Sequence, residues 1–308
     1  AVNVNECWQL VNTAERTRRH CMMLENCVYD FFELTTLNMA QQGLFGEIIH
    51  AEGAYIHNLD PYWKDYYRSW RYEFNKKHRG DIYPTHGMGP ACWALDIHRG
   101  DRMKTLVAMD TDAFNGKKLA QKHGEDSYLN GDHTTTLIRT EKGKTIEIQH
   151  NVVTPRPYNR MYQVEGTEGF ANKYPYAGFS IRTMGRQIEG SEDGKALFEN
   201  LDGESYVSRE MHDALMAEYQ HPITREGSLV ETAKRVGGHG GMDFIMDYRL
   251  VYCLHNGLPL DMDVYDMAEW CCISELSRIS LENGSMPVEV PDFTRGEWDR
   301  INGFSYSF

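Results

Sequence analysis

The stretch TTTLIRTEKGKTIEIQ, residues 134–149, decides the fold class of this chain. Two runs of β-forming residues flank a Glu141–Gly143 turn, which is typical of a β-hairpin. In the second run Ile146 and Ile148 alternate with polar residues, so one face of the hairpin is expected to be covered. The stretch therefore predicts an antiparallel sheet with one face packed against the rest of the protein.

Further strands and helices are predicted on both sides of this hairpin. Glu47–His57 and Tyr158–Glu165 are predicted as strands. Toward the N-terminus, the pattern predicts a helix over residues 5–17 with Asn5 as N-cap, a buried strand over Cys21–Leu24, and a second helix from about Val28 to Gly43. The alternation of helices and strands predicts an α/β protein.

Helices are expected to dominate the rest of the chain, most clearly over Met242–Asn256, where Gly257 supplies a stop. Residues 58–79 are predicted to form a long loop, and residues 86–98 can form a helix. That loop is rich in Tyr and Trp, which favours a functional loop over a disordered one.

Composition excludes several classes of protein. The 308 residues are 41% hydrophobic and 25% charged, as in an ordinary globular protein. A net charge of -13 opposes binding to nucleic acid. No apolar run approaches the ~20 residues of a membrane span. The seven Cys show no C-x-x-C spacing and the His residues no metal-ligand spacing, so free thiols and no metal site are expected.

The strongest candidate for chemistry is the segment GDIYPTHGMG, residues 80–89. His86 stands at a predicted helix start, where an imidazole can exchange protons near neutral pH. Tyr83 can donate or accept a hydrogen bond beside it. The alternative is a turn whose histidine only caps the helix, and the segment by itself does not choose between the two.

Two further segments combine stiff or glycine-rich backbone with polar side chains. TPRPYNR, residues 154–160, is fixed by two prolines and directs Tyr158, although the start of an edge strand with solvated charges is the favoured interpretation of this segment alone. GGHGGMD, residues 237–243, precedes a predicted helix but lacks the spacing of a dinucleotide fingerprint. We interpret the latter as a flexible approach to the helix.

Together these segments resemble glycoside hydrolase family 109, whose known members are α-N-acetylgalactosaminidases. The resemblance spans essentially the whole chain and rests on these stretches: CMMLEN 21–26, residues 46–57, YPTHG 83–87, PRPY 155–158, GGMDF 240–244 and LPLDMD 258–263. It implies a C-terminal oxidoreductase-type α/β domain with a largely antiparallel sheet at residues 46–308. Residues 1–45 would then be the C-terminal remnant of a dinucleotide-binding Rossmann domain.

The resemblance also implies a mechanism. NAD takes hydride from C3 of the sugar, the C2 proton is lost, the C1 substituent is expelled, water adds and hydride returns, with retention of configuration. The implied catalytic residues are His86 at the C3 hydroxyl and either Tyr55 or Tyr83 at C2. The substrate-binding set is Tyr55, Arg71, Tyr83, Pro84, Thr85, His86 and Tyr158, and the cofactor-binding residues are Asn26 and Tyr83.

Two departures bear on these expectations. Related dehydrogenases carry Asp four residues before the active-site histidine, where this chain has Ile82. The 308 residues do not include the glycine-rich phosphate-binding loop of the family. This chain is therefore expected to be inactive alone. The alternatives are an NAD(P)-dependent sugar or polyol dehydrogenase and a non-catalytic sugar-binding or oligomerising module.

The expected partners are a small-molecule glycoside and further copies of the chain in a homo-oligomer, with neither nucleic acid nor membrane span. The family resemblance implies export in bacteria, to the periplasm or cell surface.

Overall fold

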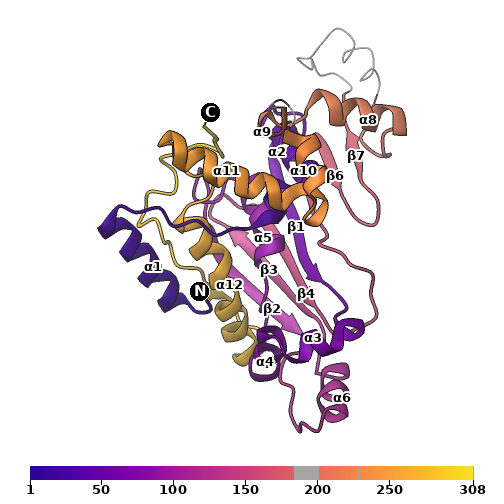
Figure 1. Cartoon of the computed structure of the whole chain (residues 1–308), viewed down its shortest axis with the longest axis vertical. Helices are drawn as coiled ribbons and strands as arrows, with labels where there is room; N and C mark the ends of the chain where they lie inside the picture. Colours follow the sequence, from indigo (N-terminus) through magenta and orange to yellow (C-terminus); the bar gives the residue numbers. More distant parts are fainter. Residues whose placement is uncertain (184–200, 226, 228, 308) are drawn as a thin grey trace.

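The computed structural model describes residues 1–183, 201–225, 227 and 229–307. Its strands, coloured from indigo to yellow along the chain in Figure 1, are β1 Ile48–Ile56, β2 Met103–Asp110, β3 Thr134–Thr140, β4 Thr145–Asn151, β5 Gln163–Gly166, β6 Gly169–Asn172, β7 Gly178–Ile181 and β8 Val288–Glu289. The α-helices are α1 Val4–Thr17, α2 Phe31–Gln41, α3 Trp63–Tyr67, α4 Trp70–Lys77, α5 Thr85–Ala94, α6 Asn115–Lys122, α8 Arg209–Glu218, α9 Pro222–Arg225, α10 Leu229–Val236, α11 Met242–Asn256 and α12 Val264–Glu282. Short 3-10 helices are η1 Asn26–Tyr29, η2 Asp60–Tyr62 and η3 His239–Gly241.

The strands form one eight-stranded sheet in the order β7-β6-β5-β1-β4-β3-β2-β8. Among the strands of the described residues, only β1 and β4 pair in parallel, and every other neighbouring pair is antiparallel. The predicted hairpin is present as β3 and β4, with Thr136 opposite Ile148. Its buried side chains alternate with more exposed ones, because one face of the sheet is covered. The prediction of a mixed α/β fold with a largely antiparallel sheet is confirmed.

Helices cover one face of this sheet. α5 packs on β1, α12 packs on β2, and α1 packs on the outer side of α12. Figure 1 shows α11 and α12 crossing in front of the strands. Helix α5 lies very close to β1: a Cβ atom built on Gly53 would stand 2.5 Å from the Cα of Gly87. Glycine at both positions therefore sets how near α5, and with it the helix start at Thr85, lies to the sheet.

The predicted strand at Cys21–Leu24 is wrong. These residues have no regular secondary structure and belong to no strand of the described chain, and the side chain of Leu24 is 50% exposed. An apolar run becomes a strand only if another strand offers it backbone partners, and the sheet ends elsewhere, at β7 and β8. The first helix also begins earlier than predicted, because Asn3 rather than Asn5 accepts the capping hydrogen bond from Glu6.

Two other boundaries differ from the predictions. Residues 58–79 are not one long loop, since they contain η2, α3 and α4. Tyr66 and Tyr72 are buried there against Tyr128, and this packing organises a segment that has no helical periodicity of its own. The strand predicted from Tyr158 is shortened to β5, because the preceding residues contact β1 only through the bridge from Ile56 to Asn159.

The predicted second helix is divided by Asp30, which caps α2 and separates it from η1. The helix over Met242–Asn256 agrees with the prediction, and Gly257 ends it in the left-handed conformation. Residues on both sides of position 45 share one core, as Cys7 and Leu34 do with Trp270. The division into 1–45 and 46–308 remains a prediction. Among the described helices, none combines the length and apolar character that crossing a membrane requires.

Candidate functional site

The predicted site residues on β1 and α5 lie together. Pro84 is the N-cap of α5, so Thr85 and His86 occupy its first turn, while Tyr55 projects from the end of β1. The ring centroids of Tyr55 and Tyr83 are 4.4 Å apart, and the His86 ring lies 5.5 Å from Tyr55 and 4.9 Å from Tyr83. The structure thus brings the three candidate catalytic side chains into one cluster.

Arg71 and Tyr158 lie at the edges of this cluster. The Arg71 guanidinium is 4.9 Å from the centroid of the Tyr83 ring and equally far from that of Trp70. The His57 ring lies between Tyr55 and Tyr158, with its centroid 5.9 Å from that of Tyr55 and 5.2 Å from that of Tyr158. All the predicted sugar-binding residues therefore surround one place at the end of β1.

Glu25 is a residue of this site that the sequence interpretation missed. Its buried carboxylate lies 2.7 Å from Nδ1 of His86. Burial would raise the pKa of Glu25, but the imidazole of His86 and hydrogen bonds from His86, Cys27 and Thr85 hold that pKa below its ordinary value. An ionised Glu25 holds the His86 ring through Nδ1, which leaves Nε2 to face a ligand.

The two tyrosines are poor acids in the free protein. Burial raises the pKa of Tyr55 to about 12, against the opposing effect of Arg71. Burial also raises the pKa of Tyr83, where Glu25 adds to the effect and Arg71 again opposes it. Both phenols are therefore protonated at neutral pH, and Arg71 is the neighbouring group that favours the phenolate of either one.

A second histidine, in the glycine-rich segment before α11, is linked to Asn26 through Asp243. Nδ1 of His239 is 2.7 Å from Oδ2 of Asp243, and the other oxygen of Asp243 accepts a hydrogen bond from the amide of Asn26. Burial would raise the pKa of Asp243, but Asn26, His239 and the nearby His86 lower it. His239 is a well exposed side chain whose Nδ1 is held by a carboxylate. The interpretation of Gly237–Asp243 as only a flexible approach to the helix missed this placement.

A small cavity lies beside the helix start and fits the nicotinamide end of a dinucleotide. It has a volume of about 210 Å³ and is lined by Ala1, Val2, Met23, Leu24, Glu25, Trp70, Phe74, Ile82, Tyr83, Pro84, Thr85, His86, Cys271 and Ser274. Its apolar walls suit a flat ring, and the His86 imidazole borders it. The predicted cofactor residue Tyr83 lines this cavity, whereas Asn26 is bonded to Asp243.

The glycine-rich segment does not fit the pyrophosphate of such a cofactor. Helix α11 begins directly after Gly241, but Asp243 lies in its first turn. A carboxylate at a helix N-terminus occupies the place that favours a phosphate. The described residues thus fit one end of NAD, and their backbone offers the phosphates no comparable cradle.

Two groups of side chains have the spacing of metal ligands. The candidate atoms of Glu25, Cys27 and His86 lie within 4.8 Å of one another, as do those of His98, Asp263 and Asp266. In the first group burial raises the pKa of the Cys27 thiol, which disfavours the thiolate that binds metal. In the second, the Arg99 guanidinium already pairs with Asp266 at 2.7 Å. Neither group has the chemistry of a free metal site.

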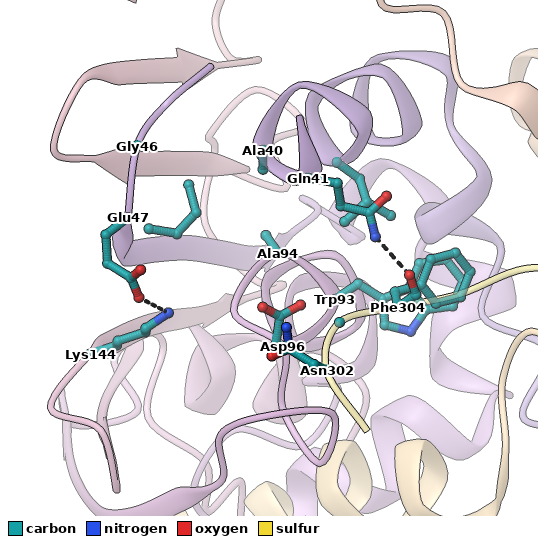
Figure 2. Close-up of a pocket in the computed structure, with 13 residues that line it drawn as sticks. Ala40, Gln41, Gly46, Glu47, Trp93, Ala94, Asp96, Lys144, Asn302 and Phe304 are labelled. Carbon is teal, nitrogen blue, oxygen red and sulfur yellow. Dashed lines mark hydrogen bonds and ion pairs between the residues drawn. The ribbon is translucent and has the colours of Figure 1, made fainter. Parts of the chain in front are cut away.

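A larger cleft lies at the opposite end of α5 and β1, away from the predicted residues. Figure 2 shows its lining, where Lys144 pairs with Glu47 at 2.7 Å and the Gln41 amide donates to the backbone of Phe304. Its volume is about 360 Å³. The half-buried Asp96 faces it, and burial raises the pKa of that carboxyl to about 6. None of the predicted site residues lines this cleft.

Known proteins resemble this chain in sequence. The sequence profile of "Glycosyl hydrolase 109, C-terminal domain" matches residues 29–300. A "Glycosyl hydrolase family 109 protein" of Porphyromonas gingivalis is 63% identical over 310 aligned residues, which cover 100% of this chain and 65% of that protein. A "Glycosyl hydrolase family 109 protein 1" of Bacteroides thetaiotaomicron is 62% identical over 312, with the same coverage. The chain thus spans about 65% of the length of these relatives.

Solved structures with little sequence similarity share the fold. An NAD binding oxidoreductase from Klebsiella pneumoniae has a TM-score of 0.63 and 14% identity, with 95% of this chain and 72% of that chain covered. An inositol dehydrogenase homolog from Azotobacter vinelandii, complexed with NADH and myo-inositol, has a TM-score of 0.53 and 15% identity, with 94% and 69% covered. The fold is that of these oxidoreductases, while the profile and the relatives decide the family. The chain belongs to glycoside hydrolase family 109.

Proposed function

We propose that the complete protein cleaves α-N-acetylgalactosaminides by oxidation, elimination, addition and reduction, with retention of configuration. The observation that supports this most is the cluster at the end of β1: His86 on its Glu25 carboxylate, with two tyrosines and Arg71 around it. When bound, NAD would supply reversible hydride exchange with C3 of the sugar. All other steps fall to side chains of this chain.

His86 accepts the proton of the C3 hydroxyl in this proposal. Its Nδ1 is taken by Glu25, so the proton is received on Nε2, and the buried carboxylate balances the charge that forms. A positioned acid or base of this kind contributes about 10²–10⁴-fold in rate. Glu25 is thus a positioning residue, because it acts on the sugar only through His86.

Tyr55 or Tyr83 removes the proton from C2 once C3 is a ketone: the phenol first releases its own proton to solvent and then acts as a phenolate. Arg71 lies against the Tyr83 ring and opposes the rise that burial causes in the pKa of both phenols, so it favours whichever phenolate forms. The two rings lie 4.4 Å apart, and this geometry leaves the choice between them open. Arg71 also has donors for the sugar hydroxyls or the N-acetyl group.

His239 protonates the oxygen that leaves C1. Expulsion of an alcohol needs a proton donor, and His239 offers an exposed imidazole whose other nitrogen is held by Asp243. The amide of Asn26, which follows Glu25 in the chain, donates a hydrogen bond to Asp243 and so connects this dyad to the segment that holds His86. The same imidazole can then deprotonate the water that adds, so acid and base alternate on one side chain.

Exchange of the C2 proton tests the reaction type. The complete protein should release N-acetylgalactosamine that carries deuterium at C2 when hydrolysis takes place in deuterium oxide, because the C2–H bond breaks in every turnover. Mass spectrometry of the product measures the incorporation. Full turnover with no deuterium at C2 would instead support direct displacement by two carboxylates.

The rival function is an NAD(P)-dependent sugar dehydrogenase. Ile82 stands where such an enzyme would carry Asp, and its side chain lines the cavity beside His86 rather than bonding a substrate hydroxyl. A dehydrogenase would accumulate NADH in proportion to product, whereas the proposed glycosidase would not.

Assembly and location are proposals as well. We propose a homo-oligomer, supported by Ile49, Met109 and Leu137, large apolar side chains exposed on sheet strands. Export to the periplasm or cell surface is proposed on the family resemblance alone.

A further inference from the structure

A buried amide joins the two segments that carry Arg71 and Tyr83. Asn130 lies in the chain between α6 and β3, and its side chain is fully buried. Its amide contacts α4, whose first turn carries Arg71, and it also contacts Gly80, three residues before Tyr83. One side chain therefore lies where the segment of the site's cation meets the segment of one of its phenols.

Both hydrogens and the oxygen of the Asn130 amide are directed at those two segments. Nδ2 donates to Oδ1 of Asn75 on α4 at 2.8 Å and to the carbonyl oxygen of Gly80 at 3.2 Å. Oδ1 accepts a hydrogen bond from the Gly80 N–H at 2.9 Å, and the backbone N–H of Asn130 donates to the carbonyl oxygen of Asn75 at 3.0 Å. A carboxylate or an apolar side chain of similar size lacks this combination of two donors and an acceptor.

The position of Gly80 is passed on to Tyr83. Gly80 has a φ of +105°, and a Cβ atom built on it would stand 2.6 Å from Oγ of Ser277 on α12. The N–H of Asp81 donates to the same hydroxyl at 3.0 Å, and the Asp81 carboxyl accepts a hydrogen bond from the Tyr83 N–H at 3.3 Å. The segment from Gly80 to Tyr83 is thus held at each step, so a displacement of Gly80 would move the phenol.

Arg71 depends on the same amide from the other side. Asn75 lies one turn after Arg71 on α4 and donates to its carbonyl oxygen at 2.9 Å. The Arg71 guanidinium is 4.9 Å from the centroid of the Tyr83 ring and opposes the rise that burial causes in the pKa of that phenol. Because the effect of a charge falls with distance, a shift of α4 relative to Gly80 would weaken this effect and misplace the guanidinium donors.

We propose that Asn130 is a positioning residue of the sugar site, which acts by holding Arg71 at the ring of Tyr83. Its effect on catalysis rests on the proposed function, whereas the placement of Arg71 does not depend on the reaction. A buried amide that served only the core could be satisfied by any neighbouring backbone. The hydrogen bonds of Asn130 go instead to the two segments that carry the cation and the phenol.

A double-mutant cycle in the complete protein tests this role. Asn130→Asp keeps an acceptor for the Gly80 N–H but loses both donors of the ionised side chain. It should lower kcat/KM for an α-N-acetylgalactosaminide by about 10²-fold, the effect that a misplacement of about 1 Å can have. Arg71→Lys keeps a cation but loses the planar guanidinium. In the Arg71→Lys background, Asn130→Asp should lower kcat/KM far less, because the group that it positions is gone. Equal fold losses in the two backgrounds would overturn the proposal.

Asn38→Asp is the matched control. Asn38 is another buried amide, on α2, and it donates to the carbonyl oxygen of Tyr219 at 2.9 Å. This variant should lower the unfolding midpoint and leave kcat/KM unchanged. If Asn130→Asp does not fold, Asn75→Ala takes its place in the cycle, because it removes the side-chain partner on α4 and keeps the two bonds from Asn130 to Gly80. A smaller loss, again reduced in the Arg71→Lys background, is then expected.

A crystal structure of the variant used in the cycle separates this proposal from the proposed function. It should show the Arg71 guanidinium displaced from the Tyr83 ring by about 1 Å or more. An unchanged separation of 4.9 Å would overturn the proposal, whatever the reaction is. If the guanidinium is displaced but the parent protein cleaves no α-N-acetylgalactosaminide, the role of Asn130 stands and the proposed function fails.

Discussion

At the scale of single residues, the two histidines of the site should be separable by leaving group. His86→Ala should slow cleavage of an aryl and an alkyl α-N-acetylgalactosaminide alike, by about 10²–10⁴-fold, because C3 oxidation precedes both. His239→Ala should slow the alkyl glycoside far more, since an aryl oxide leaves without a proton. Initial rates of the complete protein measure both. Near-normal turnover by His86→Ala would show that His86 does not act at C3. If His239→Ala slowed the aryl and the alkyl glycoside equally, His239 would not be the proton donor to the leaving group.

Asp81 makes stability depend on pH. Its side chain is fully buried, one oxygen has no hydrogen-bond partner, and burial raises its pKa to about 7. Between its ordinary pKa of 3.8 and about 7 the unfolded chain loses a proton that the folded chain keeps, so stability falls as pH rises. Asp81→Asn should raise the unfolding midpoint at pH 8 by ~2 °C or more, with the difference shrinking toward pH 4. Thermal unfolding measures this difference, with Asp112→Asn, at an exposed position, as the control. An equal shift of the unfolding midpoint at pH 8 and pH 4 in Asp81→Asn would contradict the prediction.

At the scale of elements, the close approach of α5 to β1 holds the site together. A Cβ on Gly53 would lie 2.6 Å from the carbonyl oxygen of Gly87, which cannot move without moving the first turn of α5. Gly53→Ala should therefore cost about 1–3 kcal/mol of unfolding free energy and displace His86 from Tyr55. Urea unfolding measures the first effect, and activity well below the unfolding midpoint measures the second. A variant as stable and as active as its parent would show that this contact does not position His86.

At the scale of the whole molecule, the 308-residue chain by itself should not bind NAD with micromolar affinity. The cavity beside His86 accommodates only the nicotinamide end, and Asp243 opposes a phosphate at the start of α11. Contacts from Asn26 and Tyr83 to the nicotinamide ring cannot replace a phosphate-binding loop and an adenine pocket. Calorimetry with NAD tests this, and micromolar binding by the chain alone would show that the cofactor site is misplaced.

Elements with a strong local pattern could be predicted from the sequence. The β3–β4 hairpin was readable from Ile146 and Ile148, and the end of α11 from Gly257, because side-chain alternation and a stop residue act within a few positions. Cys21–Leu24 failed for the opposite reason: whether an apolar run pairs depends on distant strands. The α3 and α4 segment failed because burial of Tyr66 and Tyr72, rather than helical periodicity, organises it.

By itself the sequence determined the α/β fold, the family and the position of His86 at a helix start, since each rests on short motifs or local periodicity. Only the tertiary structure decided which groups act on that histidine. Glu25 stands 61 positions from His86 along the chain, and Asn26 stands 217 from Asp243, yet each pair is in hydrogen-bonding contact. No local pattern marks such partners, because a carboxylate acquires its role from the burial and the imidazole that folding brings to it.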